Sequence, residues 1–163
     1  MKKSLFILVA VAMFATLLVG CGTPAPVGEA LITVSGKIGK TNSGDNYVLD
    51  QAAFDAKSVE LTYNDPWMGD GLKYKGILLK DLITLVKPKS DVTTVSLIAT
   101  DGKAFDIALA DAKQYNIILA RWVDGALLTE ANGGPVKVAY SDDAKATYPD
   151  TQWAWWVVEV KFK

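Results

Sequence analysis

The side chains of this sequence that could bind a ligand are mostly aromatic, because the usual catalytic and metal-binding residue types are almost absent. The sequence has no histidine and a single cysteine, Cys21. It therefore lacks a Ser-His or Cys-His nucleophile pair, the usual zinc ligands and a disulfide framework. The metals that such a sequence could still bind are hard cations with oxygen ligands, such as calcium. The acidic residues at 65–70 and 142–150, however, do not match the twelve-residue calcium loop.

Three tryptophans are candidates for stacking on a flat ring. Trp67 follows a proline and precedes the glycine-rich stretch 68–71, where a large ring is hard to bury locally, so a place in a cleft and packing beneath the loop are both open. Trp153 and Trp155 share one face of an extended segment and could form an exposed stacking platform. Trp156 points to the other face, and we expect it in the core.

Arg121 and Trp122 form a second candidate pair. Arg121 is the only arginine, and its planar guanidinium suits an anion or a ring face better than an ammonium does, although a surface or ion-paired role is the alternative. Trp122 is the next residue of a predicted strand and should point to the opposite face. One of the two is expected inside the protein and the other beside a ligand.

Short strands with alternating apolar residues, separated by turn signals, position these side chains. We predict strands at 31–38, 59–63, 74–78, 94–100, 104–107, 117–123, 136–140 and 155–162. We predict helices at 50–56, 79–86 and 109–115. Because strands and helices do not alternate regularly, an α+β fold with mixed or antiparallel sheets is favoured over a doubly wound parallel sheet.

The N-terminus reads as an export signal. Lys2 and Lys3 precede an apolar stretch, 4–19, that is short for a membrane span, and the run Leu-Val-Gly before Cys21 resembles the bacterial lipobox. We predict a lipoprotein signal peptide at 1–20, a flexible tether at 21–29 that begins with lipidated Cys21, and one domain at 30–163. A buried cysteine beside a transmembrane helix is the alternative.

The charge balance argues against nucleic acid as a partner. Removal of Lys2 and Lys3 from the 17 basic residues would leave 15, against 18 acidic residues, so the exported chain would be mildly acidic. Lysines are spread along it, and a single arginine offers no cluster of bidentate phosphate donors. We therefore expect a membrane association through lipid and no binding to DNA or RNA.

Five stretches, in order and in register, resemble the molybdopterin-binding domain of sulfite-oxidase-like oxidoreductases. They are TYNDPW at 62–67 followed by KYKGILLKDLI at 73–83, ATDG at 99–102, ILARWVDGALL at 118–128, NGGPVKV at 132–138, and WVVEV at 156–160. The resemblance covers about 31–162 and implies the α+β fold of that family.

The departures from this resemblance concern the cofactor. The metal enzymes carry a cysteine ligand where this sequence has Tyr63, which we expect to fill the vacated space. Their histidine before Gly-Gly-Pro is Asn132 here, and residues that resemble a clamp for the cofactor phosphate are replaced by Gln152, Trp153 and Trp155. A phosphorylated, metal-loaded pterin would lose its thiolate and much of its charge partner, so we do not expect the molybdenum cofactor.

Small periplasmic proteins that share this domain without the cysteine are a closer resemblance, and they look like binders of a free pterin. A pterin is a flat polar heterocycle, so its site needs a planar group to stack on and polar groups for its edge. The ligand-binding residues that this resemblance implies are Trp67, Arg121, Trp122, Asn132, Tyr140, Trp153 and Trp155.

We therefore expect a lipid-anchored protein outside the cytoplasm that binds a small molecule, such as a free pterin, without redox catalysis and with no covalent group except lipid. The ligand would order the Trp67 loop and the loop 141–151, and a membrane or envelope protein would recognise the altered surface. Two alternatives remain: an accessory envelope lipoprotein with a degenerate pocket, and a molybdopterin-dependent oxidoreductase.

Overall fold

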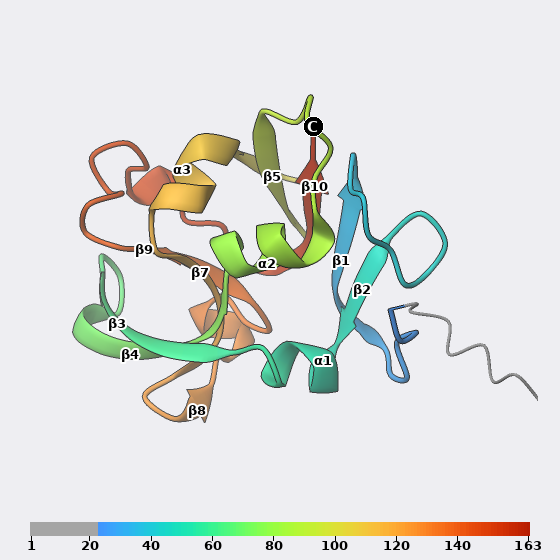
Figure 1. Ribbon diagram of the computed structural model, residues 1–163. Helices are drawn as coiled ribbons and strands as arrows, with labels where there is room; N and C mark the ends of the chain where they lie inside the picture. The colour runs from blue at the N-terminus through green and yellow to red at the C-terminus, as the bar shows by residue number, and fades with distance from the viewer. Residues whose placement is uncertain (1–22) are drawn as a thin grey trace, which may run out of the picture.

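The first and last strands of the chain lie side by side in a five-stranded sheet (Figure 1). The computed structural model describes residues 23–163, so the predicted signal peptide at 1–20 and Cys21 lie outside it. The sheet order is β2-β1-β10-β5-β6, with β1 at Ala30–Gly36, β2 at Tyr47–Asp50, β5 at Thr94–Ala99, β6 at Ala104–Ala108 and β10 at Val157–Phe162. β1 and β10 are parallel, and the other neighbours are antiparallel.

A second sheet is antiparallel throughout. Its strands are β3 at Val59–Asp65, β4 at Gly69–Leu78, β7 at Ile117–Val123, β8 at Ala126–Leu127 and β9 at Lys137–Tyr140. β4 lies between β3 and β7 in this sheet. On its other edge, β7 pairs with β8 near the C-terminal end of β7 and with β9 along the rest. One mixed and one antiparallel sheet confirm the predicted α+β class.

The helices are short and lie where the apolar pattern predicts them. They are α1 at Gln51–Asp55, α2 at Leu79–Val86 and α3 at Leu109–Gln114, with 3-10 turns η1 at Glu130–Asn132 and η2 at Asp150–Gln152. Asp50 caps α1, because its Oδ1 accepts the N–H of Ala53 at 2.8 Å. α2 ends at Lys87, whose φ of 50° is left-handed, and Pro88 follows it.

The amphipathic face of α2 explains its place in the core. Leu79, Leu82, Ile83 and Val86 are buried, and the helix packs against β4, β7 and α3. Burial of one such aliphatic side chain contributes about 1.5–3 kcal/mol to stability. This packing fixes the C-terminal half of β4, and with it the hairpin that β4 forms with β3.

Three of the differences from the predicted elements have a clear structural cause. β2 was not predicted, because its four residues carry little periodicity before they pair with β1. β4 begins at Gly69 rather than at 74, since the glycine-rich stretch continues the hairpin with β3. β10 begins at Val157 rather than at 155, because Trp156 has a φ of 54° that interrupts extended backbone.

The end of the predicted tether is attached to the domain. The backbone N–H groups of Val27 and Gly28 donate to Asp50 Oδ2 at 2.9 and 3.1 Å. The part of 21–29 that lies at 27–28 is therefore held by a carboxylate rather than free, although the side chain of Val27 is exposed. Between residues 23 and 163, no helix is long and apolar enough to cross a membrane.

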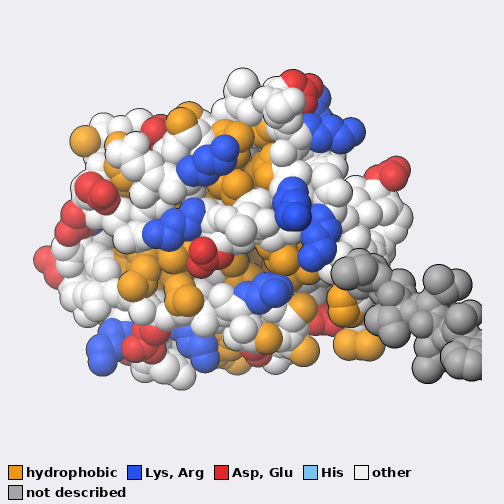
Figure 2. Space-filling model, viewed as in Figure 1, with side chains coloured by type: hydrophobic (Ala, Val, Ile, Leu, Met, Phe, Trp, Pro, Cys, Tyr) orange, Lys and Arg blue, Asp and Glu red, His pale blue; other side chains and the backbone are white. Residues whose placement is uncertain are grey.

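On the face drawn in Figure 2, basic side chains are spread over the middle of the surface, and most acidic side chains lie near its edges. Two of the exposed lysines are paired with carboxylates, Lys37 with Asp91 and Lys163 with Asp106. The exposed lysines are thus distributed over the surface, as they are along the sequence.

Candidate functional site

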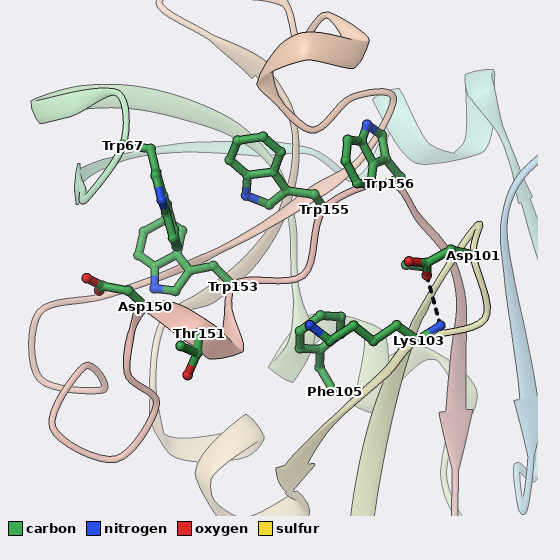
Figure 3. Close-up of a pocket in the computed structure, with 10 residues that line it drawn as sticks. Trp67, Asp101, Lys103, Phe105, Asp150, Thr151, Trp153, Trp155 and Trp156 are labelled. Carbon is green, nitrogen blue, oxygen red and sulfur yellow. Dashed lines mark hydrogen bonds between the residues drawn. The ribbon is translucent and has the colours of Figure 1, made fainter.

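A pocket of about 310 Å³ lies where three distant chain segments meet (Figure 3). The segments are the turn between β3 and β4, the β5–β6 hairpin, and the stretch from η2 to the start of β10. The residues that line the pocket are Trp67, Ala99, Asp101, Lys103, Phe105, Asp150, Thr151, Trp153, Trp155 and Trp156. In the view of Figure 3, Trp67, Trp155 and Trp156 form one side, and Lys103 and Phe105 form the opposite side.

The tryptophans of the pocket support one another edge to face. The ring centroids of Trp67 and Trp153 are 5.7 Å apart at an interplanar angle of 71°, and those of Trp67 and Trp155 are 5.8 Å apart at 82°. Such pairs contribute about 0.5–1.5 kcal/mol beyond the area that they bury. Trp67 is nevertheless 50% exposed, so a large part of its ring is free to meet a ligand.

The backbone at Trp156 brings two successive indoles to the same pocket. In a regular strand Trp155 and Trp156 would face opposite sides, but the left-handed φ of Trp156 breaks the alternation. The backbone N–H of Trp156 donates to Gly133 O, and its Nε1 donates to Glu130 O, both at 2.9 Å. The prediction that Trp156 lies in the core is therefore wrong, since its half-buried ring lines the pocket.

Gly133 makes room for this arrangement. Its φ is 88°, and a Cβ there would lie only 2.9 Å from Cγ of Trp155. A side chain at position 133 would push the indole toward the pocket or open the turn that holds Trp156. Gly133 thus shapes the pocket wall as well as the turn in which it lies.

A buried ion pair lies behind the tryptophans. Lys137 and Asp65 are both inaccessible to solvent at their side chains, and Lys137 Nζ is 2.5 Å from Asp65 Oδ2. The ammonium also lies 4.8 Å from the ring centroid of Trp155, 5.5 Å from that of Trp153 and 5.6 Å from that of Trp67. A cation in contact with three indole faces is stabilised by their quadrupoles, which offsets part of the cost of burying it.

Asp65 anchors the turn that carries Trp67. Its Oδ1 accepts the backbone N–H groups of Trp67 and Met68 at 2.8 and 2.9 Å, and its Oδ2 accepts the hydroxyl of Tyr74 at 2.7 Å as well as Lys137. The carboxylate is fully hydrogen-bonded, which is the condition under which a buried charge is tolerated. The position of Trp67 over the pocket therefore depends on Asp65.

The same bonds shift the pKa of both partners. Burial raises the pKa of the Asp65 carboxyl, but the hydrogen bonds from Lys137, Tyr74 and Trp67 outweigh burial and hold that pKa below its ordinary value of 3.8. Burial lowers the pKa of Lys137 below 10.5, although Asp65 opposes this shift. The lowered pKa keeps the Asp65 carboxylate charged at neutral pH, and the ion pair with Asp65 opposes the loss of charge from Lys137.

Acid should weaken the protein through this carboxylate. Because the pKa of Asp65 is lower in the folded protein than in the unfolded chain, its contribution to stability is present above pH 3.8 and is lost as the pH falls through the folded pKa. We expect the melting temperature to drop between about pH 5 and 2. Thermal unfolding of the wild type and of Asp65→Asn checks this, and an equal drop in both would contradict the role of Asp65.

Three of the seven predicted ligand-binding residues line this pocket: Trp67, Trp153 and Trp155. Trp153 is 4% exposed rather than part of an open platform, because the Trp67 turn covers it. Its Nε1 is buried and has no hydrogen-bond partner among residues 23–163.

Arg121 and Trp122 lie elsewhere, on β7. The guanidinium of Arg121 is 2.9 Å from Asp55 of α1 and 4.9 Å from the ring centroid of Trp122, and neither residue lines the pocket. The pairing of β7 with β4 is irregular between Trp122 and Ala120, which leaves Arg121 in a bulge. The bulge disrupts the strict alternation that was predicted for this pair.

Tyr140 and Asn132 also stand outside the pocket lining. Tyr140 is fully buried and stacks on Tyr148 with centroids 5.3 Å apart, and its edge contact with Trp153 supports that indole from behind. Asn132 is half-buried in η1, next to Gly133. These two residues belong to the frame around the pocket.

Tyr63, which the sequence resemblance places at the cysteine of the metal enzymes, is packed inside the protein. It is 3% exposed, its hydroxyl donates to Asn116 O at 3.1 Å, and its ring meets that of Tyr74 at 6.0 Å. Burial raises the pKa of its hydroxyl far above the ordinary value of 10.0, so the group stays neutral. The phenol occupies this place as a packed, hydrogen-bonded side chain.

Sequence reasoning missed the residues that complete the site. Lys137 was passed over although it is the only charged residue in the predicted strand 136–140, an exception that signals a buried charge with a partner. Asp65 was considered only as one of the acidic residues at 65–70, and its burial was not predicted. Asp101 and Lys103 lie in a turn of ordinary composition, and only the fold brings them to the pocket.

The fold and pocket define a domain of the molybdopterin-binding oxidoreductase type. Residues 50–162 match the family described as "Oxidoreductase molybdopterin binding domain", and the chain belongs to this family. Among solved structures, the chain is similar to the sulfane dehydrogenase SoxCD from Paracoccus pantotrophus, with a TM-score of 0.61 at 12% identity. The match covers 80% of this chain and 37% of the SoxCD chain, and it bears on the fold alone. The comparison with curated proteins gives no match.

Proposed function

We propose that this protein is an exported, lipid-anchored binding protein that holds a flat, pterin-like heterocycle in its tryptophan pocket without redox catalysis. The observation that carries the proposal is the pocket itself, in which four indoles surround a space with polar groups at its rim. Small-molecule sites usually have apolar or aromatic walls and a few polar groups that fix orientation. A flat heterocycle meets both demands.

The side chains around the pocket support the proposal that its ligand carries no metal. Within residues 23–163, no group of three or more histidine, cysteine or acidic side chains is placed to hold a metal ion. Tyr63 stands where the metal enzymes have cysteine, and its neutral phenol is engaged with Asn116 O. Molybdenum prefers a soft thiolate, so these residues do not fit a molybdenum-bearing cofactor, and we propose no redox step.

Two loops that touch the pocket suggest how occupancy would be signalled. Asn64 Nδ2, beside the Trp67 turn, donates to Asp142 Oδ2 of the loop 141–151 at 2.7 Å, and Asp150 and Thr151 line the pocket opposite Trp67. A ligand would contact both loops at once and stabilise one arrangement of them. A membrane or envelope protein would recognise that arrangement.

Binding of 6-hydroxymethylpterin to the full-length protein in detergent tests the proposal. We expect saturable quenching of tryptophan emission, since three pocket indoles lie within stacking or edge distance of one another. In Trp67→Ala the affinity should fall about tenfold, because the most exposed stacking face of the pocket is lost.

Trp122→Ala is the matched control, because Trp122 lies outside the pocket, against Lys75 and Arg121. This variant should bind as the wild type does. An absence of saturable quenching in the wild type would refute pterin binding, and an equal affinity of Trp67→Ala would refute the assigned pocket.

A further inference from the structure

The charged side chains at the pocket rim limit the ligands that it can hold. Asp101, Asp150 and Lys103 line the pocket, and they leave it with one net negative charge. None of the three forms an ion pair with another side chain of residues 23–163. Lys103 Nζ lies 4.7 Å from the ring centroid of Phe105, and in Figure 3 this side chain reaches across the pocket floor.

The other two lysines near the pocket are already neutralised. Lys137 lies behind the tryptophans and is bound to Asp65, and Lys145, 6.0 Å from the ring centroid of Trp153, is paired with Asp142 at 2.7 Å. A phosphate group in the pocket would therefore meet a single free ammonium and two carboxylates. Phosphate sites are instead built from several cations or from arginine forks.

The polar groups that remain match the edge of an uncharged heterocycle. The carboxylates of Asp101 and Asp150 accept hydrogen bonds from ring amino and N–H groups. The ammonium of Lys103, which lines the pocket, can donate to a ring carbonyl or ring nitrogen. The volume of about 310 Å³ is near the lower end of the range of about 300–1,000 Å³ for small-molecule sites.

We propose that the pocket selects an unphosphorylated heterocycle with amino donors at its edge and rejects the phosphorylated form of the same ring. This inference rests on the proposed function and adds the charge class of the ligand. Selection follows from repulsion between the phosphate and the carboxylates of Asp101 and Asp150, which one ammonium cannot offset.

The test compares 6-hydroxymethylpterin with its phosphate monoester, which differ only in the phosphate, by quenching of tryptophan emission in the full-length protein. We expect the uncharged compound to bind about tenfold more tightly at low ionic strength. In the double variant Asp101→Asn, Asp150→Asn, the ratio of the two affinities should fall toward unity. Asp45→Asn, which removes an exposed carboxylate away from the pocket, should keep the wild-type ratio.

The outcomes separate the two proposals. If neither compound binds, the proposed function fails. If both bind with equal affinity, or the phosphate ester binds more tightly, the pocket holds a pterin but the charge selection is wrong. An unchanged ratio in the double variant would also overturn the selection, because the discrimination would then come from groups other than these two carboxylates.

Discussion

Asp65→Ala should lower the free energy of unfolding by about 3–5 kcal/mol, because it leaves the buried ammonium of Lys137 without its counter-charge. Both side chains are inaccessible to solvent, so water cannot replace the lost partner. The variant also removes the acceptor for the N–H groups of Trp67 and Met68 and for the hydroxyl of Tyr74. The Trp67 turn should therefore loosen as the protein weakens.

Urea unfolding, followed by tryptophan emission, measures this loss. Asp91→Ala is the control, since it breaks the exposed ion pair with Lys37, where the two side chains are 62% and 50% accessible. We expect that control to lie within about 1 kcal/mol of the wild type. A similarly small effect of Asp65→Ala would show that the buried pair contributes little, and the anchoring of Trp67 by Asp65 would have to be abandoned.

Gly76→Val should be almost as damaging, for a reason of space alone. A Cβ at position 76 would lie 2.0 Å from Leu119 O and 2.7 Å from Cα of Ala120, so β4 and β7 would have to separate. Overpacking of a filled interior usually costs about 1–3 kcal/mol, and backbone atoms cannot move aside as a flexible side chain can. We expect a loss of about 3 kcal/mol or more.

Thermal unfolding of Gly76→Val beside Gly28→Ala tests this prediction. A Cβ at Gly28 would meet only ordinary contacts, of which the nearest is Asp50 Cβ at 3.5 Å. That control should unfold like the wild type. If Gly76→Val unfolds at the temperature of the control, the close approach of β4 and β7 is not as the structure describes it.

Patterns in the sequence predicted the helices and strands whose formation depends on neighbouring residues in the chain. The helix at 79–86 coincides with α2, because four apolar residues on one face and Pro88 after the last turn define it without reference to the rest of the chain. Alternation predicted most strands, and the resemblance predicted the family. β2 was not predicted, because it forms through its pairing with β1. The start of β10 was predicted too early, because the left-handed backbone of Trp156 ends the extended segment before it.

Contacts between distant residues account for what was missed at the site. Arg121 could not be assigned its partner Asp55, which is 66 residues away in the sequence, and a bulge changed its expected orientation. Trp67, Trp153 and Trp155 were identified by type, but only the fold shows that they surround one space. The pair of Asp65 and Lys137 spans 72 residues, so its role in holding Trp67 is a tertiary property.

Composition analysis of the full-length protein, extracted in detergent from the membranes of its native host, tests the central claim most directly. Mass spectrometry and fluorescence of the released small molecules should detect a pterin-like heterocycle in near-stoichiometric amount, and elemental analysis should detect neither molybdenum nor tungsten at that level. Stoichiometric molybdenum or tungsten would contradict the account, because it would require a metal centre that the residues around the pocket do not fit.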